Sequence, residues 1–166
     1  MTSIVLEGSE PPATAEMHAM PGHLIRRMHQ ASQAIFDGEM GAHGFDITPV
    51  QYAALVVIGE RPGLDQATLA TAIAFDRATT GGVIDRMETK GLIRREIDKA
   101  DRRARRLFIE PAGESLLAGA VPHIRLVQHR MLQGLSATER ATLLGLLGKA
   151  LDAVADVSRQ SMRDGA

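Results

Sequence analysis

Apolar residues recur at helical spacing near both ends of the chain. One stripe runs from Leu24 to Met40 and predicts a long helix that starts at Pro21. Two further stripes predict a helix after Pro111 and a last helix after Ser136. A single chain would leave these wide stripes exposed to water. We therefore expect the three helices to pair with a second copy of the chain.

The middle of the chain has shorter apolar stretches, separated by residues that start or stop helices. Thr48-Pro49-Val50-Gln51 predicts a helix start, because Thr48 can cap and Gln51 completes a capping box. Asp65 and Asp76 can each cap a short helix, and only Ala74-Phe75 connects the two helices. Two short helices joined by a tight turn form a helix-turn-helix, whose second helix enters the DNA major groove.

A hairpin is expected directly after the helix-turn-helix. Leu92–Ile97 and Arg105–Ile109 are strand candidates, and the polar segment 98–103 between them would be the hairpin tip. The stretch from Arg94 to Arg106 carries seven basic and three acidic residues, whereas the remaining positions hold 12 basic and 17 acidic residues. Positive charge concentrated in one place is typical of an element that faces phosphates. The hairpin is therefore predicted to be the wing of a winged helix.

Composition excludes several other classes. The chain has no Cys, which rules out disulfides, thiolate metal sites and a cysteine redox switch. No Lys or Arg precedes Arg26, so a basic secretory leader is not expected, and the longest apolar run, Ala53–Ile58, is too short to span a bilayer. Aromatic residues make up 3% of the chain, which suits helices packed through aliphatic side chains. We expect a soluble, cytoplasmic protein with no membrane partner.

The predicted fold class is mainly α with a small β wing, an α+β arrangement. Residues 46–110 are expected to form the winged helix-turn-helix domain that binds DNA. Residues 21–45 and 111–164 are expected to form a helical dimerisation region, and residues 1–20 a flexible tail.

DNA contacts are expected on the second short helix and the wing. Arg77, Thr80 and Gly81 are predicted to face outward, with Val83 and Met87 in the core. Arginines of the wing would reach the minor groove or the phosphates. The alternative is that these polar side chains form a solvated surface. The residues predicted to contact DNA are Thr68, Arg77, Thr79, Thr80, Gly81, Arg86, Lys99, Arg102, Arg103 and Arg105.

Three motifs together resemble the MarR family of transcriptional regulators. They are the stretch from Asp76 to Arg95, the wing sequence Asp98-Lys99-Ala100-Asp101-Arg102-Arg103, and Pro111-Ala112-Gly113. The resemblance covers residues 21–160 and implies a dimeric winged helix whose DNA affinity responds to small, frequently aromatic, acids. Segments 21–27, 48–55 and 65–70 also resemble the MarR subgroup that controls the catabolism of aromatic acids such as nicotinate or hydroxycinnamate.

An effector site is predicted on the first long helix and the start of the next. His23 and Arg27 are four residues apart and share a helix face, Arg26 is adjacent, and Tyr52 is the single tyrosine. Together they could bind an aromatic acid, with a guanidinium on its carboxylate. The alternative is that these side chains form surface salt bridges and ordinary packing. The six histidines are scattered and none pairs with another at i,i+4, so no metal and no cofactor are expected.

The function predicted from the sequence is a dimeric transcriptional regulator, most simply a repressor. It would bind pseudo-palindromic double-stranded DNA and be released by a small aromatic carboxylic acid. The alternative is a constitutive, architectural DNA-binding dimer without an effector, which predicts little sequence preference. An enzyme is not expected, because no nucleophile elbow, phosphate loop or metal triad is present.

Overall fold

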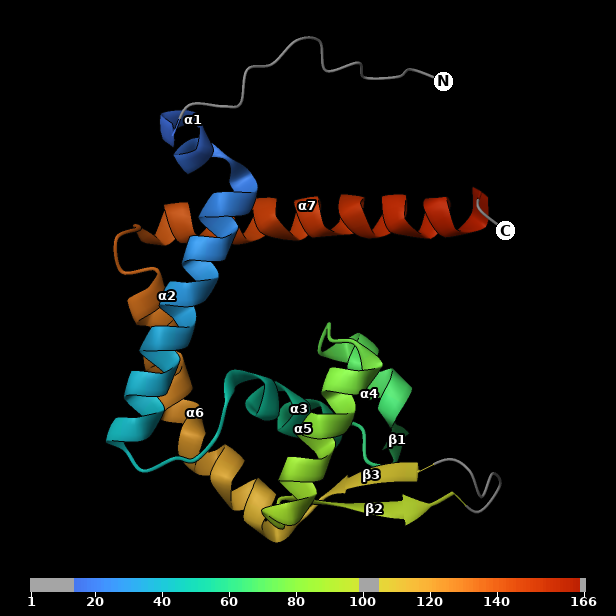
Figure 1. Ribbon diagram of the computed structural model, residues 1–166. Coiled ribbons are helices and arrows are strands. Elements are labelled where there is room, and N and C mark those ends of the chain that lie inside the picture. Colours follow the sequence, from blue (N-terminus) through green and yellow to red (C-terminus); the bar gives the residue numbers. More distant parts are fainter. Residues whose placement is uncertain (1–13, 99–104, 165–166) are drawn as a thin grey trace. The chain divides into compact units, whose positions relative to one another are not determined.

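The computed structural model describes residues 14–98 and 105–164, and it contains a mainly helical chain with one small sheet (Figure 1). The described elements are, in chain order, α1 (Thr14–Ala19), α2 (Pro21–Ala42), α3 (Pro49–Glu60), β1 (Leu64–Asp65), α4 (Gln66–Ala72), α5 (Arg77–Thr89), β2 (Ile93–Ile97), β3 (Arg105–Ile109), α6 (Pro111–Met131) and α7 (Ala137–Asp164). The chain divides into two compact units, residues 1–127 and 128–166. The first unit contains the described part of the winged helix-turn-helix, and the predicted fold class is confirmed.

The sheet is antiparallel, with the strand order β1-β3-β2. The predicted hairpin is present, and Arg95 of β2 pairs with Leu107 of β3. Strand β1, in which Leu64 pairs with Leu107 and Asp65 with Arg106, was not predicted. A strand of two residues is too short to show alternation.

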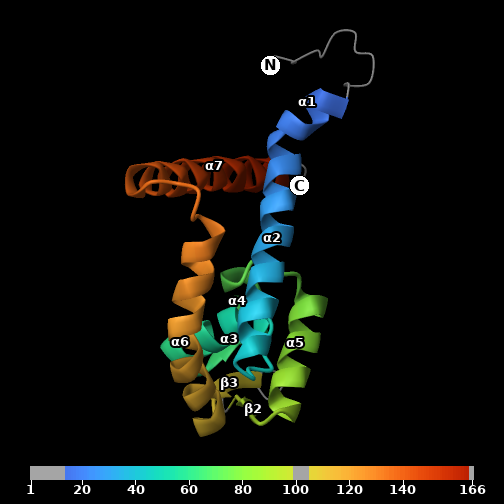
Figure 2. The same ribbon diagram turned by 90° about the vertical axis from the view of Figure 1, so that its left-hand side faces the viewer.

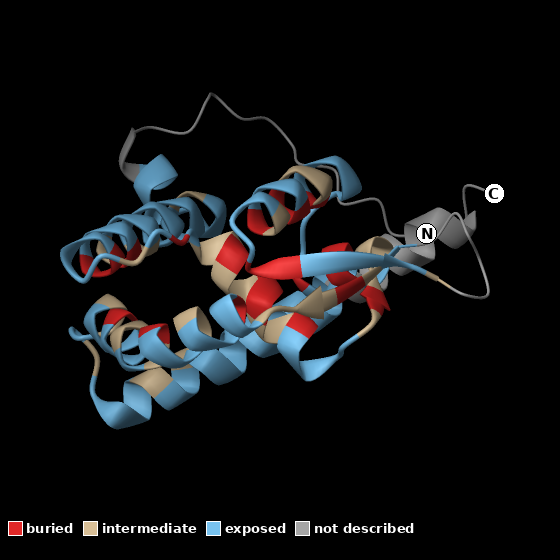
Figure 3. Ribbon diagram, turned by 90° about the horizontal axis from the view of Figure 1, so that it is seen from below, coloured by how far each residue is buried: buried red, intermediate tan, exposed pale blue. Residues whose placement is uncertain are grey.

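Helices α3, α4 and α5 pack with the sheet around one hydrophobic core. Figure 3 shows the buried positions on the inward faces of the helices and at the root of the sheet. The C-terminal half of α2 contributes Phe36 and Met40 to this core, and α6 contributes Ala120 and Val127. In Figure 2, α3 lies between α6 on one side and α5 on the other. We call α3, α4, α5 and the sheet the DNA-binding lobe. The two flanking helices α2 and α6 pack against this lobe through the same apolar cluster.

The helix starts follow the predicted caps. The Thr48 hydroxyl accepts from the Gln51 N–H at 3.3 Å, and the Gln51 side chain accepts from the Thr48 N–H at 3.1 Å. Asp65 and Asp76 cap α4 and α5. These three caps set where each helix of the DNA-binding lobe begins, and all three predictions are confirmed.

The turn between α4 and α5 has an unusual backbone. Ala74 has a φ of 56°, in the left-handed region that favours glycine. The N–H of Phe75 donates to the Ala70 carbonyl at 3.0 Å and closes the turn. At the far end of α5, Gly91 takes a φ of 69° and the N–H of Leu92 donates to the Met87 carbonyl at 3.0 Å, which ends α5 just before β2.

One of the remaining elements differs from the expectation. Thr14–Ala19 forms α1 within the segment predicted to be a flexible tail, while residues 1–13 of that segment lie outside the described residues. Pro122 lies inside α6, and the helix continues past it to Met131. None of the helices in the described ranges is long and apolar enough to cross a membrane.

Candidate DNA interface and effector cavity

The predicted recognition helix is α5, and its N-terminal turn presents part of the predicted DNA-contacting set. Arg77 and Thr79 are exposed at the start of α5, and Thr68 is exposed on α4. The Gln66 side chain of α4 donates to the Arg77 carbonyl at 3.0 Å, so the two helices are joined where they would meet DNA. This contact positions the first residue of α5 relative to α4.

The predicted outward face of α5 is wrong for Thr80. This side chain is fully buried, and its hydroxyl donates to the Asp76 carbonyl at 2.8 Å. Thr80 lies on the same stripe as Val83 and Met87, which are buried as predicted. A threonine that bonds the carbonyl one turn back satisfies its hydroxyl within the helix and can face the core. It is therefore not available to DNA.

Gly81 of α5 lies beside the Gln66 side chain of α4. A Cβ on Gly81 would lie 3.2 Å from the Gln66 amide nitrogen. A glycine inside a helix costs about 1 kcal/mol relative to alanine, and the close contact with Gln66 is a reason for glycine at this position. Gly81 is half-buried, whereas it was predicted to face outward.

The wing is described only in part. Lys99, Arg102 and Arg103, which were predicted to contact DNA, lie outside the described residues. Arg105 is exposed at the first position of β3. The predicted contacts of these four residues therefore stay predictions.

Three arginines of the basic stretch form ion pairs within the protein. The Arg95 guanidinium pairs with Asp85 at 2.8 Å and with Glu88, both on α5. Its hydrogen bonds to the Glu88 carboxylate hold the pKa of that group below its usual range. This cluster attaches β2 to the recognition helix, so the charge of Arg95 is largely compensated locally.

Arg94 and Arg106 act in the same way on either side of the hairpin. Arg94 binds Glu110 and Glu96, each at 2.9 Å, and its guanidinium lies 4.7 Å from the Phe108 ring centroid. Hydrogen bonds to Glu110 and then Glu96 raise its pKa. Arg106, another arginine of the predicted wing, binds Asp98 and the Gly63 carbonyl. The concentration of basic residues therefore overstates the charge that this stretch presents to DNA.

The two aspartates that cap the helices of the helix-turn-helix have lowered pKa values. A hydrogen bond from the Thr68 N–H lowers the pKa of Asp65, and hydrogen bonds from the Thr79 hydroxyl and N–H lower the pKa of Asp76. When the pKa of a carboxyl group is lower in the folded than in the unfolded protein, its charge stabilises the fold at pH values above the unfolded pKa, about 3.9. This stabilisation is lost as the pH falls through the folded pKa.

We accordingly expect the double variant Asp65→Asn, Asp76→Asn to show a smaller loss of stability on acidification than the wild type. Asn retains the capping oxygen but has no charge to lose. Urea unfolding at pH 6 and pH 3 measures the difference between the two proteins. Asp152→Asn, inside α7 and capping no helix, is the control. Equal pH dependence in the double variant and the wild type would refute the role given to the two caps.

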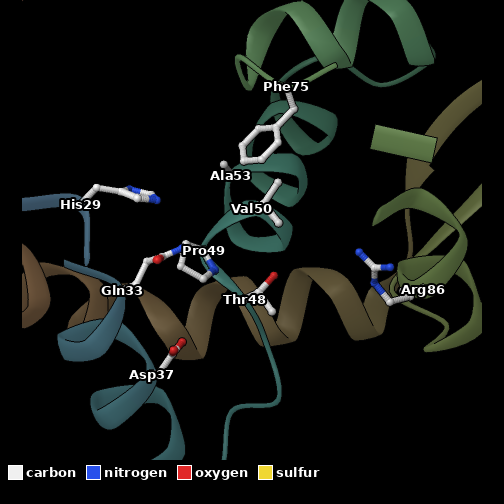
Figure 4. Close-up of a pocket in the computed structure, with 9 residues that line it drawn as sticks. All are labelled: His29, Gln33, Asp37, Thr48, Pro49, Val50, Ala53, Phe75 and Arg86. Carbon is white, nitrogen blue, oxygen red and sulfur yellow. The ribbon is translucent and has the colours of Figure 1, made fainter. Parts of the chain in front are cut away.

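An open cavity lies between α2, the start of α3 and the recognition helix (Figure 4). Its volume is about 480 Å³, within the range of small-molecule sites. The lining residues are His29, Gln33, Asp37, Thr48, Pro49, Val50, Ala53, Phe75 and Arg86. They come from α2, from α3 and its cap, from the α4–α5 turn, and from α5.

The lining combines an apolar wall with a few polar groups. Phe75 and Val50 supply apolar surface, and His29 and Gln33 lie opposite them on α2 (Figure 4). Arg86 brings a cation from the recognition helix, although the sequence analysis placed it among the DNA contacts. Asp37 adds a carboxylate on the α2 side of the cavity.

The four predicted effector residues do not line this cavity. His23 contacts His18, with Nε2 and Nδ1 3.2 Å apart, and Arg26 and Arg27 are exposed. Tyr52 is half-buried against the core cluster. Their role as a site therefore stays a prediction.

The sequence contained a signal for the α2 wall that was not used. His29 and Gln33 are four residues apart and share a face with Arg26, one turn earlier. The contributions of Phe75 and Arg86 could not be found in this way, because they depend on how α5 packs against α3.

These features define a winged-helix DNA-binding protein: a capped helix-turn-helix, a wing attached to its second helix, and flanking helices that share its core. Residues 47–104 match the model of the MarR family. The chain is 35% identical over 130 residues to the transcriptional regulator HosA of Escherichia coli, an alignment that covers 78% of this chain and 93% of HosA. The chain belongs to the MarR family of transcriptional regulators.

Two further relatives agree with this assignment. The transcriptional repressor NicR of Pseudomonas putida is 31% identical, over 79% of this chain and 82% of NicR. The solved structure of BpsR of Bordetella bronchiseptica, whose DNA binding is regulated by 6-hydroxynicotinic acid, superposes with a TM-score of 0.77. BpsR is 29% identical to this chain, and the match covers 99% of BpsR and 86% of this chain.

Proposed function

We propose that this MarR-family regulator is a dimeric repressor of aromatic-acid catabolism, released from its operator by a small aromatic carboxylic acid. The observation that carries the proposal is the cavity in which α2 and the recognition helix α5 line the same space. A ligand bound there contacts the element that reads DNA. The relatives NicR, a repressor, and BpsR, regulated by 6-hydroxynicotinic acid, support the same kind of function.

The exposed apolar residues of α2 and α7 support the dimer. Leu24 and Ile25 on α2 and Leu144, Leu147 and Leu151 on α7 are all exposed in the single chain. Apolar surface of this extent is covered in stable proteins, and a second copy with the same stripes is the simplest cover. A symmetric dimer would present two recognition helices about 34 Å apart, which fits a pseudo-palindromic site.

The cavity chemistry supports an aromatic acid as the effector. A ring would contact Phe75 and Val50, and its carboxylate would pair with the Arg86 guanidinium. Arg26 shares the α2 face of His29 and would stand at the mouth, and His23, Arg27 and Tyr52 would add contacts from the adjoining turns. The four predicted effector residues do not line the cavity itself, and the proposal keeps them as contacts from the adjoining turns.

Release would follow from unequal binding to two arrangements of the dimer. An acid that pairs with Arg86 favours one position of α5 relative to α2, and DNA favours one spacing of the two recognition helices. The acid weakens DNA binding only if its favoured arrangement has a different spacing, because equal affinity for both arrangements shifts nothing.

Fluorescence anisotropy on the DNA that flanks the gene, beside scrambled DNA of equal length at the same salt concentration, tests the proposal. A panel of aromatic carboxylic acids is then added to the complex. Selective binding that one acid abolishes is the expected result. Selective binding that no acid changes would leave a constitutive regulator, and equal affinity for both DNAs would leave an architectural protein.

A variant of Arg86 separates the effector role from a DNA contact. For Arg86→Ala we expect an acid concentration for half-release at least about tenfold higher, since losing a charged hydrogen bond costs about 1.5–3 kcal/mol. Operator affinity should change much less. Arg86→Lys keeps the charge but lacks the planar guanidinium. Its acid concentration for half-release should lie between those of the wild type and Arg86→Ala. A large loss of operator affinity with release at the wild-type acid concentration would instead assign Arg86 to DNA.

A further inference from the structure

Three ionisable side chains gather where the end of α2 meets α6. Glu39 and His43 lie one turn apart on α2 and its C-terminal cap, and His123 lies on α6. The Nδ1 atoms of His123 and His43 lie 2.9 Å and 3.3 Å from the same Glu39 carboxylate oxygen. One donor atom from each of the three residues falls within 4.8 Å of the other two.

The surroundings of the cluster are those of a built site. The Glu39 side chain is only 4% exposed, so its carboxylate needs polar partners in the folded protein. The His43 and His123 rings lie against each other, with centroids 3.9 Å apart, and the Phe45 ring lies 5.4 Å from His123. The His43 side chain is 45% exposed and opens the cluster to solvent.

We propose that Glu39, His43 and His123 bind a divalent transition-metal ion of the zinc type. Two imidazole nitrogens and one carboxylate oxygen form a ligand set that zinc takes in sites with one open position, and water reaches that position beside exposed His43. Magnesium and calcium prefer oxygen ligands alone. Donors around tetrahedral zinc lie about 3.4 Å apart, so the spacings from Glu39 to the two imidazoles already suit the ion. To bind it, the His43 Nδ1 atom would have to leave the Glu39 backbone carbonyl, from which it lies 2.9 Å.

This site contradicts the sequence-based expectation of no metal. That expectation rested on histidine pairs at i,i+4, whereas the pair here is Glu39 with His43. His123 joins them only in the fold, 84 residues after Glu39. A bound ion would connect the end of α2 to α6 just before the Thr48 cap of α3. It therefore adds a cross-link to the DNA-binding lobe that is independent of the proposed effector.

Zinc binding to the full-length protein without a polyhistidine tag tests the site. Competition with a chromophoric chelator gives stoichiometry and affinity, and thermal unfolding with and without zinc gives the stabilisation that binding to the native state produces. We expect one zinc per chain and a raised unfolding midpoint. Affinity should fall as the pH is lowered, because protons compete for the ligands.

The variants His43→Ala and Glu39→Gln should each bind zinc at least about tenfold more weakly, because even the loss of a side chain that only hydrogen-bonds to a metal ligand costs that much, and should lose the midpoint shift. His129→Ala, an exposed histidine of α6 outside the cluster, should bind as the wild type does. His43 is exposed, so its removal leaves the fold in place even if the Glu39 variant is unstable. No stoichiometric zinc on the wild type, wild-type affinity in His43→Ala, or an equal loss in His129→Ala would each overturn the proposal.

Discussion

Replacing Gly113 by Ala is expected to lower the free energy of unfolding by about 3 kcal/mol or more. Gly113 is buried in the first turn of α6, against the root of the wing. A Cβ at this position would lie 2.3 Å from the Leu92 carbonyl oxygen and 2.9 Å from a side-chain carbon of Ile109. The carbonyl is backbone and already accepts from the Glu110 N–H at 2.9 Å, so it cannot move aside cheaply. Overpacking against flexible neighbours costs about 1–3 kcal/mol, and this contact is tighter.

Chemical unfolding of Gly113→Ala beside Gly38→Ala measures this effect. Gly38 lies inside α2, and a Cβ there would meet nothing within 4 Å. The control substitution should therefore stabilise by about 0.5–1 kcal/mol through helix propensity and the unfolded chain. If both alanines changed stability in the same direction, the close packing of α6 on Leu92 would be wrong.

The second large effect is expected for Arg77→Ala, which should reduce the preference for operator over scrambled DNA by about 1–3 kcal/mol. Arg77 is the exposed first residue of α5, and the Gln66 bond to its carbonyl holds it in place. An arginine at the start of a recognition helix can donate two hydrogen bonds to one guanine. Losing them weakens binding to the operator far more than binding to scrambled DNA.

Anisotropy with both DNAs at one salt concentration measures the ratio of the two affinities. Arg125→Ala removes the same charge from an exposed position of α6 and should leave the ratio unchanged. If Arg77→Ala lowered both affinities by the same factor, the residue would contact phosphates and would not read bases.

The local signals in the sequence were sufficient for the helix-turn-helix. Thr48, Asp65 and Asp76 each bond the backbone three residues on, so the helix starts depend on neighbours along the chain and were predicted. The hairpin strands were found for a similar reason. Their apolar residues and the polar tip between them are visible within a short stretch of sequence.

The features that were missed depend on packing between distant segments. Whether Thr80 faces in or out depends on a hydroxyl bond within α5 and on the helices around it, and a polar residue suggested the wrong face. The ion pair in which Glu110 neutralises the charge of Arg94 requires the wing to lie beside the start of α6. Arg86 reaches the cavity only because α5 packs beside α3. None of these arrangements follows from spacing along the chain.

The most direct test of the account compares the affinity of the releasing acid for the free protein and for the protein bound to its operator. Linkage requires the ratio of these two affinities to equal the factor by which the acid weakens DNA binding. Isothermal titration calorimetry of the acid into both samples should give tighter binding to the free protein by that factor, and the Arg86→Ala variant should bind weakly in both. Equal affinity for the free and the DNA-bound protein would show that the cavity is not coupled to DNA binding.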